Sequence, residues 1–324
     1  MVDVLVILDG ASEPLRNRPT SLERARTPTL DRLARRGVLW RLRTVPAGLP
    51  AGSEHALPTL LGWPPPARVD RAALEAAARG VELAPGERAW RVDCREPGGR
   101  RAGERSSAMA AVALARSLPH HRVMPLEGHR LLVCGEPPLP PLPPGLHAWP
   151  DGIVPPALLD RSTVLIAAPG AAAGIGRLMG ARVVTPSGAT GRPGTDLAAK
   201  AAAARAAAAT GAARVVVHVG APDEAAHDRE RPVKVRTIER ADRELVAPLA
   251  WLVGRHGGTL TVCPDHGCDP RTGRHDADPV PALRWTPGSA GSDRPGARLT
   301  ERAVASLPET SVREALSARQ EALA

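Results

Sequence analysis

Short continuous apolar runs alternate along the chain with longer stretches in which apolar residues recur every three or four positions. Runs such as VDVLVIL, TVLIAA, RVVVHV and GTLTVC are typical of strands buried on both faces of a parallel sheet. The stretches between them predict helices, among them AAGIGRLMG and an alanine-rich helix from about Thr195 to Thr210. Strands that alternate with helices indicate an α/β fold, a mostly parallel sheet with helices on both faces.

Two further segments extend this pattern. SLERARTPTLDRLARRG predicts a helix that ends near Gly37, followed by a strand at VLWRLR. VKVRTIERADRELVAPLAWLVGRHG predicts another helix, placed before the strand GTLTVC. The C-terminal residues, SARQEALA, are predicted to form a surface helix or a frayed tail.

The pattern changes between about Pro64 and Pro156, where prolines multiply and apolar runs shorten. LEAAARG and SSAMAAVALARSL predict helices here, RAWRVDC and HRLLVCG predict strands, and GEPPLPPLPPGLHAWPDG predicts an extended connector. We therefore predict a small inserted α+β domain at 64–156 and a core domain formed by 1–63 and 157–324.

The charge and composition of the chain indicate which class of molecule it binds. The net charge of +9 over 324 residues indicates an anionic partner, but the arginines are scattered and only 2% of residues are aromatic. A small phosphorylated metabolite is therefore favoured over nucleic acid, which requires stacking surfaces. No long uncharged apolar stretch occurs and Asp3 lies near the N-terminus, so we expect no membrane span, no signal peptide and a cytoplasmic protein.

Acidic residues and histidines follow three of the predicted strands. They are Asp9, then Asp223 and His227 in a predicted loop, then Asp265, His266 and, in the loop beyond, His275. A single Asp there is most often a helix cap, and a lone His is most often structural. The carboxyl ends of parallel strands meet at one edge of the sheet, so the set together favours two divalent ions. The four cysteines lack paired zinc-ribbon spacing and are expected to be ordinary reduced thiols.

Ser53 in GLPAGSEHALPTLLGW follows a glycine-containing turn and opens a predicted helix, whose N-terminus favours an anion. Taken alone it would be an N-cap. Beside two metal ions, however, its hydroxyl can ionise and attack phosphorus.

Several segments together resemble the archaeal-type cofactor-independent phosphoglycerate mutases of the alkaline phosphatase superfamily. They include VLVILDG, PAGSEHALPTLLG, GATG, VHVGAPDEAAHD, PDHG and RHDADPVP. The resemblance implies an alkaline-phosphatase-like fold and two metal sites. One site would be formed by Asp9, Ser53, Asp265 and His266, and the other by Asp223, His227 and His275. Ser53 would also carry the phosphoryl group during transfer.

The chain departs from this family around the nucleophile, where GSEHAL stands for Gly-Ser-Asp-Thr-Ala-His, and in the inserted segment, where RVDCRE stands for Arg-Cys-Asn-Phe-Ala. In the family the inserted domain closes over the substrate and excludes water. Arginine suits carboxylate and phosphate, so the candidate substrate residues are Arg101, Arg130 and Arg177, with Lys200, Glu54 and His55 as weaker candidates. Each arginine has a solvated surface position as its alternative.

The resemblance implies a metal-dependent phosphotransferase that isomerises phosphoglycerate or acts on another small phosphorylated carboxylic acid. Mn²⁺ or Zn²⁺ are the expected ions, and Mg²⁺ or Co²⁺ also suit the ligands. Two alternatives stay open: a metal-dependent phosphatase, and a biosynthetic paralogue that acts on another phosphate or phosphonate ester. The sequence does not indicate the oligomeric state.

Overall fold

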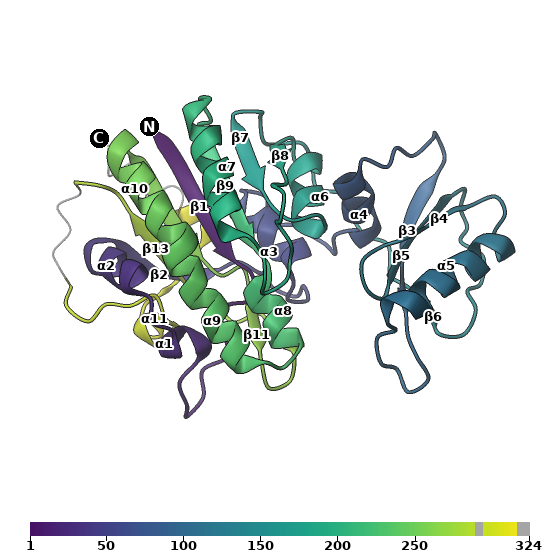
Figure 1. The fold of residues 1–324 in the computed structure, drawn as a ribbon, viewed down its shortest axis with the longest axis horizontal. Helices are drawn as coiled ribbons and strands as arrows, with labels where there is room; N and C mark the ends of the chain where they lie inside the picture. Colours follow the sequence, from purple (N-terminus) through teal and green to yellow (C-terminus); the bar gives the residue numbers. More distant parts are fainter. Residues whose placement is uncertain (289–293, 316–324) are drawn as a thin grey trace.

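A mostly parallel sheet forms the centre of the larger part of the molecule (Figure 1). The computed structural model describes residues 1–288 and 294–315. Within them the strands lie in the order β14 (Glu309–Ser311), β2 (Val38–Arg43), β13 (Val280–Trp285), β10 (Gly258–Cys263), β1 (Val2–Leu8), β9 (Arg214–Val219), β7 (Thr163–Ile166) and β8 (Arg182–Val184). The predicted α/β class is confirmed. β13 was not predicted, and it pairs antiparallel with both β10 and β2.

Helices cover both faces of this sheet because side chains alternate along its strands. Val4 and Val6 of β1 pack against α2 (Pro28–Arg36), α7 (Leu197–Ala209), α9 (Arg231–Ala241) and α10 (Ala247–His256). The five-residue π-helical turn η1 (Asp242–Val246) joins α9 to α10. Leu5 and Ile7 point the other way, towards α3 (Ser53–Leu60) and α6 (Ala171–Leu178). Each face of the sheet therefore has its own apolar core.

Two local predictions were wrong. The helix predicted to run to Gly37 is two helices, α1 (Ser21–Arg24) and α2, because Pro28 lacks an N–H and keeps Thr27 out of the helical conformation. The predicted loop that carries Asp223 and His227 is instead a short helix, α8 (Ala221–His227). The prediction for the C-terminal tail concerns residues 317–324, which lie outside the described residues.

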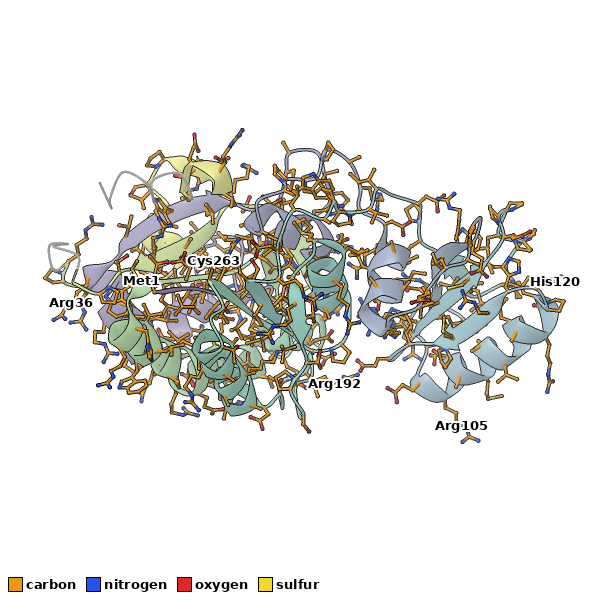
Figure 2. All side chains as sticks on the ribbon, turned by 90° about the horizontal axis from the view of Figure 1, so that it is seen from above. Met1, Arg36, Arg105, His120, Arg192 and Cys263 are labelled. Carbon is orange, nitrogen blue, oxygen red and sulfur yellow. The ribbon has the colours of Figure 1, made fainter. Side chains whose placement is uncertain are left out.

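A smaller antiparallel sheet lies to one side of the larger part (Figures 1 and 2). Its order is β4 (Arg122–Pro125), β5 (Arg130–Gly135), β3 (Arg88–Cys94) and β6 (Leu146–Ala148), with α5 (Glu104–Ser117) packed on it. Figure 2 places His120, which follows α5, at the end of the smaller part that lies farthest from the larger part. α5, β3 and β5 match elements predicted for 64–156, whereas β4 was not predicted and β6 lies in the segment predicted to be an extended connector. The domain division itself stays a prediction. No helix in the described ranges is long and apolar enough to cross a membrane.

α4 (Arg71–Arg79) connects the two parts by packing closely on α6. A Cβ atom at Gly174 of α6 would lie 1.9 Å from the backbone oxygen of Leu74. Only glycine fits at this crossing, so the sequence GIG in α6 sets how near the smaller part approaches the core.

A buried carboxyl group ties the C-terminal part of the chain to the loop after β1. Glu301, the first residue of α11 (Glu301–Val304), accepts hydrogen bonds from Ser12 Oγ (3.2 Å), the Glu13 N–H (2.8 Å) and Thr20 Oγ1 (2.7 Å). Burial outweighs these bonds and raises the pKa of Glu301 to about 7, against an ordinary value of 4.5.

Replacing this carboxyl, Glu301→Gln, should flatten the pH dependence of stability. The folded protein holds the Glu301 proton more tightly than the unfolded chain, so the free energy of unfolding from this group falls as the pH rises from 4.5 to about 7. The slope is at most about 1.4 kcal/mol per pH unit. Urea titrations from pH 5 to 8 measure it, and parallel curves for variant and wild type would contradict the assignment.

Candidate metal centre

The loops that follow β1 and β10 form the first group of potential ligands. Asp9 follows β1 directly, and its Oδ1 lies 3.3 Å from His266 Nε2. Asp265 Oδ2 lies 3.6 Å from the same nitrogen. Asp265 Oδ1 accepts the N–H of Gly10 at 3.0 Å, which joins the two loops. His218, on β9 beside β1, is a second histidine partner of Asp9, with Nε2 3.2 Å from Oδ2.

The second group joins α8 to a hairpin. Asp223 and His227 lie one helical turn apart on α8, with Asp223 Oδ2 3.1 Å from His227 Nε2. The hairpin of β11 (Gly267–Asp269) and β12 (Arg274–Asp276) brings in His275. Its Nε2 lies 3.2 Å from Asp223 Oδ1 and 2.9 Å from His227 Nε2.

The two groups adjoin one another. One ligand atom from each of Asp9, Asp223 and His266 lies within 4.8 Å of the others. Gly10, with φ of +58°, separates them, and a Cβ atom there would lie 2.3 Å from Asp223 Oδ1. A residue larger than glycine at this position would enter the centre and would also be strained.

The donor set fits divalent cations. Asp223 Oδ1 and Asp265 Oδ2 are buried without a hydrogen-bond partner among the described residues. Each of His227, His266 and His275 places Nδ1 3.0 to 3.1 Å from a backbone carbonyl, those of Gly273, Gly267 and Ala51 respectively. A carbonyl only accepts, so Nδ1 carries the proton and Nε2 faces the centre, the arrangement usual for metal-binding histidine. These residues could hold two ions.

When no metal is bound, the buried carboxylates and histidines of this centre shift one another's pKa values. Burial and Asp223 raise the pKa of Asp9, but hydrogen bonds from His218 and His266 outweigh them and leave it lowered. Burial and then Asp9 raise the pKa of Asp265 to about 6. Burial lowers the pKa of His266, yet Asp265 and Asp9 raise it well above its ordinary value. Positive charge is therefore strongly favoured at this position.

Ser53 lies beside the first group. It is the first residue of α3, after Gly52 in an extended conformation, as the sequence predicted. Its hydroxyl donates to Asp9 Oδ1 at 3.2 Å, and its Oγ lies 3.4 Å from His266 Nε2. The hydroxyl is half-buried and lies where the helix N-terminus favours an anion.

Comparison with known proteins places the chain in a family. Residues 1–307 match the family model described as the metalloenzyme superfamily. The chain belongs to that superfamily. It is 30% identical to the 2,3-bisphosphoglycerate-independent phosphoglycerate mutase of Methanosarcina acetivorans, over 85% of this chain and 87% of the relative. It is 29% identical to the enzyme of the same name from Methanopyrus kandleri, over 87% of each.

Solved structures agree on the fold. A protein of Pyrococcus horikoshii superposes with a TM-score of 0.80 at 22% identity, covering 99% of this chain and 97% of its own. The cofactor-independent phosphoglycerate mutase of Thermoplasma acidophilum gives a TM-score of 0.54 at 19% identity, over 99% of each chain. The resemblance inferred from the sequence motifs is confirmed, and the chain is a phosphoglycerate-mutase-like metalloenzyme.

Two of the predicted substrate arginines, Arg101 and Arg130, influence residues of the second ligand group and of α8 through their charge. Burial lowers the pKa of His227, but Asp223 raises it above its ordinary value. The positive charge of Arg101 opposes that rise.

Arg130 also has protein partners: its Nη1 lies 3.6 Å from Oε1 of the buried Glu75, and its Nε donates to the Glu127 backbone oxygen at 2.9 Å. Its charge opposes the rise in the pKa of Glu224 that burial and Asp223 cause. Both arginines belong to the smaller part, and both act by charge on residues of α8.

Four other predicted substrate residues have protein partners. Arg177 donates to the backbone oxygens of Ala77 and Ala78, and Glu54 pairs with Arg71 at 2.6 Å. His55 is fully buried, with Nδ1 2.9 Å from the Pro50 oxygen and Nε2 accepting the Val69 N–H. Lys200 is also fully buried, and its Nζ donates to the His218 oxygen at 2.6 Å. These contacts favour structural roles.

Sequence reasoning missed two arginines near the nucleophile loop. Arg71 pairs with Glu54, next to Ser53, and its guanidinium lies 5.0 Å from the ring of Trp149. Arg91 lies 4.7 Å from the same ring and bonds Asp93 at 3.1 Å. Arg91 Nη1 is buried without a partner among the described residues. The arginines come from different elements, so no spacing in the sequence signals them.

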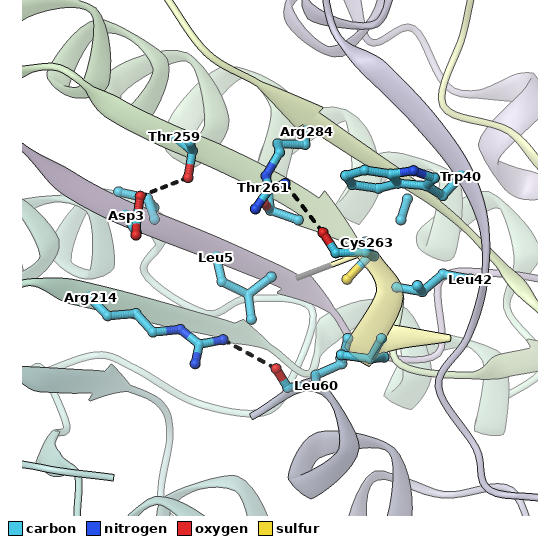
Figure 3. A pocket seen from close by; sticks show the side chains of 14 residues that line it. Asp3, Leu5, Trp40, Leu42, Leu60, Arg214, Thr259, Thr261, Cys263 and Arg284 are labelled. Atoms are coloured by element: carbon cyan, nitrogen blue, oxygen red, sulfur yellow. Dashed lines mark hydrogen bonds between the residues drawn. The ribbon is translucent and has the colours of Figure 1, made fainter. Parts of the chain in front are cut away.

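A separate apolar cavity lies on the sheet face opposite α7 and α10, lined by Leu5, Trp40 and Cys263 (Figure 3). Its basic groups bind backbone oxygens: Arg214 that of Leu60, and Arg284 that of Ala315. This cavity is distinct from the ligand groups at the carboxyl ends of the strands.

Proposed function

We propose that this protein is a metal-dependent phosphomutase that transfers a phosphoryl group within a small phosphorylated carboxylic acid through phosphorylated Ser53, with phosphoglycerate as the leading substrate. The observation that carries the proposal is the position of Ser53, whose Oγ lies 3.2 Å from Asp9 at the junction of two ligand groups. The names of the relatives support the choice of substrate. We infer that the enzyme acts in the cytoplasm.

The chain supplies a residue for each part of the reaction. Asp9, Asp265 and His266 would hold one ion beside Ser53, and Asp223, His227 and His275 would hold the other. When bound, the ions lower the pKa of the serine hydroxyl and neutralise charge on the phosphoryl oxygens. Ser53 Oγ forms a bond to phosphorus while the ester bond to the substrate oxygen breaks. A second hydroxyl of the same acid then attacks phosphorus and releases Ser53.

The smaller part would keep the intermediate from hydrolysis. Arg101 and Arg130 act by charge on residues of α8, and arginine side chains suit the substrate's carboxylate or phosphate. While these side chains retain the dephosphorylated acid and exclude water, the phosphoryl group returns to the acid. A looser closure would give a phosphatase instead.

Incubation of the Mn²⁺- or Zn²⁺-loaded protein with 3-phosphoglycerate should give 2-phosphoglycerate, detected by phosphorus NMR. A matched sample treated with chelator should give none. Free phosphate as the main product would indicate the phosphatase. If neither product forms, phosphoglycerate is excluded as the substrate, and the altered GSEHAL loop would point to another phosphate or phosphonate ester.

A further inference from the structure

The second ligand group contains a cysteine that the two-metal scheme does not use. Cys268 offers its sulfur to the same cluster as Asp223, His227 and His275, with the four ligand atoms all within 4.8 Å of one another. The cysteine lies in the middle of β11 and is the direct cross-strand partner of His275 on β12. Opposite residues of an antiparallel pair project on the same side, so the hairpin presents sulfur and imidazole together.

The surroundings of this sulfur differ from those of an ordinary core cysteine. Cys268 is fully buried, and Asp223 beside it is nine-tenths buried with Oδ1 lacking a hydrogen-bond partner among the described residues. Cys263, five positions earlier, lies on β10 in an apolar core and lines the separate cavity of Figure 3. Only one of these two neighbouring thiols therefore faces polar ligand atoms.

The backbone holds Cys268 in place from two directions. Its N–H donates to the Ser12 oxygen at 2.9 Å, and its carbonyl accepts from the buried Lys234 Nζ at 2.7 Å. The loop after β1 and helix α9 thus fix the hairpin against the ligands from α8. A sulfur held this firmly can serve as a preorganised ligand.

We propose that Cys268 is the fourth protein ligand of the second metal site and that it makes this site selective for zinc over manganese and magnesium. Sulfur and imidazole are preferred by zinc, whereas manganese and magnesium prefer oxygen. On binding, the S–H bond breaks, a metal–sulfur bond forms and the proton passes to solvent. The group around Asp9 contains no sulfur, so the two sites would differ in preference. This inference rests on the second metal site of the proposed function.

Cobalt substitution tests the ligand directly. Metal-free protein loaded with two equivalents of Co²⁺ should show a near-ultraviolet sulfur-to-cobalt charge-transfer band. Cys268→Ser should still bind cobalt but lose the band, and Cys263→Ser, the matched control, should keep it. The affinity for Zn²⁺ should fall in Cys268→Ser by more than the ~10-fold typical of lost outer contacts, with Mn²⁺ affinity little changed.

X-ray absorption of the zinc-loaded wild-type protein gives a second readout that needs no variant. It should show one sulfur at about 2.3 Å from zinc. Two bound ions with neither the sulfur signal nor the charge-transfer band would overturn the role of Cys268 and leave the two-metal function standing. Failure to bind any divalent ion would overturn both.

Discussion

Ser53→Ala should lower phosphoryl transfer by at least about three orders of magnitude while the protein stays folded and retains metal. The loss is expected because the Ser53 hydroxyl, which lies beside Asp9 and His266, is the proposed nucleophile. Alanine has no group that can attack phosphorus. The measurement is kcat/KM for formation of the product that the wild-type enzyme makes, together with the amount of bound metal after dialysis.

The matched control is Thr59→Ala. Thr59 lies on the same helix and loses a hydroxyl of similar size, but that hydroxyl donates to the His55 oxygen at 2.8 Å and not to the ligand groups. Activity near the wild-type level is expected for it. Acid quenching of wild type during turnover should also trap one phosphoryl group on the peptide that contains Ser53. Turnover that persists in Ser53→Ala would rule out a phosphoserine mechanism.

The sequence was informative about the core because burial on both faces imposes continuous apolar runs. β1, β7, β9 and β10 were all predicted from such runs. β13 was missed: its VPALRW segment contains a proline and pairs antiparallel with both β10 and β2, so it lacks the pattern of a central parallel strand. α8 was missed because it is only seven residues long and two of its side chains are ligands. Its apolar residues are too few to show helical periodicity.

The part of the candidate site that could be predicted consists of ligands that follow neighbouring parallel strands. Asp9, Asp223 and Asp265 all lie at carboxyl ends of neighbouring strands, and parallel strands bring such ends together. The division of the ligands into two groups came from the family resemblance. Cys268 could not be assigned from sequence, because its position beside His275 depends on the register of a short hairpin. The sequence gives one indication of a role for His218: it is a histidine inside the apolar run RVVVHV.

Asp223→Asn should remove most activity and reduce bound metal from two ions to one or fewer. Asp223 contacts His227 and His275 and also adjoins Asp9 and His266, so it borders both ligand groups. Burial raises the pKa of Asp223 when no metal is bound, but the contacts with His227 and His275 outweigh it and leave the pKa well below the ordinary value. An amide has the same shape but cannot supply the negative charge that divalent ions require.

Metal analysis after dialysis and thermal unfolding with and without chelator measure this effect. In wild type, bound metal should raise the melting temperature, because ligands that bind only the folded state stabilise it. This gap should shrink in Asp223→Asn. Asp242→Asn is the control: Asp242 is also buried but accepts the N–H groups of Thr29 and Leu30, so its amide variant should keep two ions and the full gap. Unchanged metal content in Asp223→Asn would contradict the placement of the second ion, since no other carboxylate bonds both His227 and His275 among the described residues.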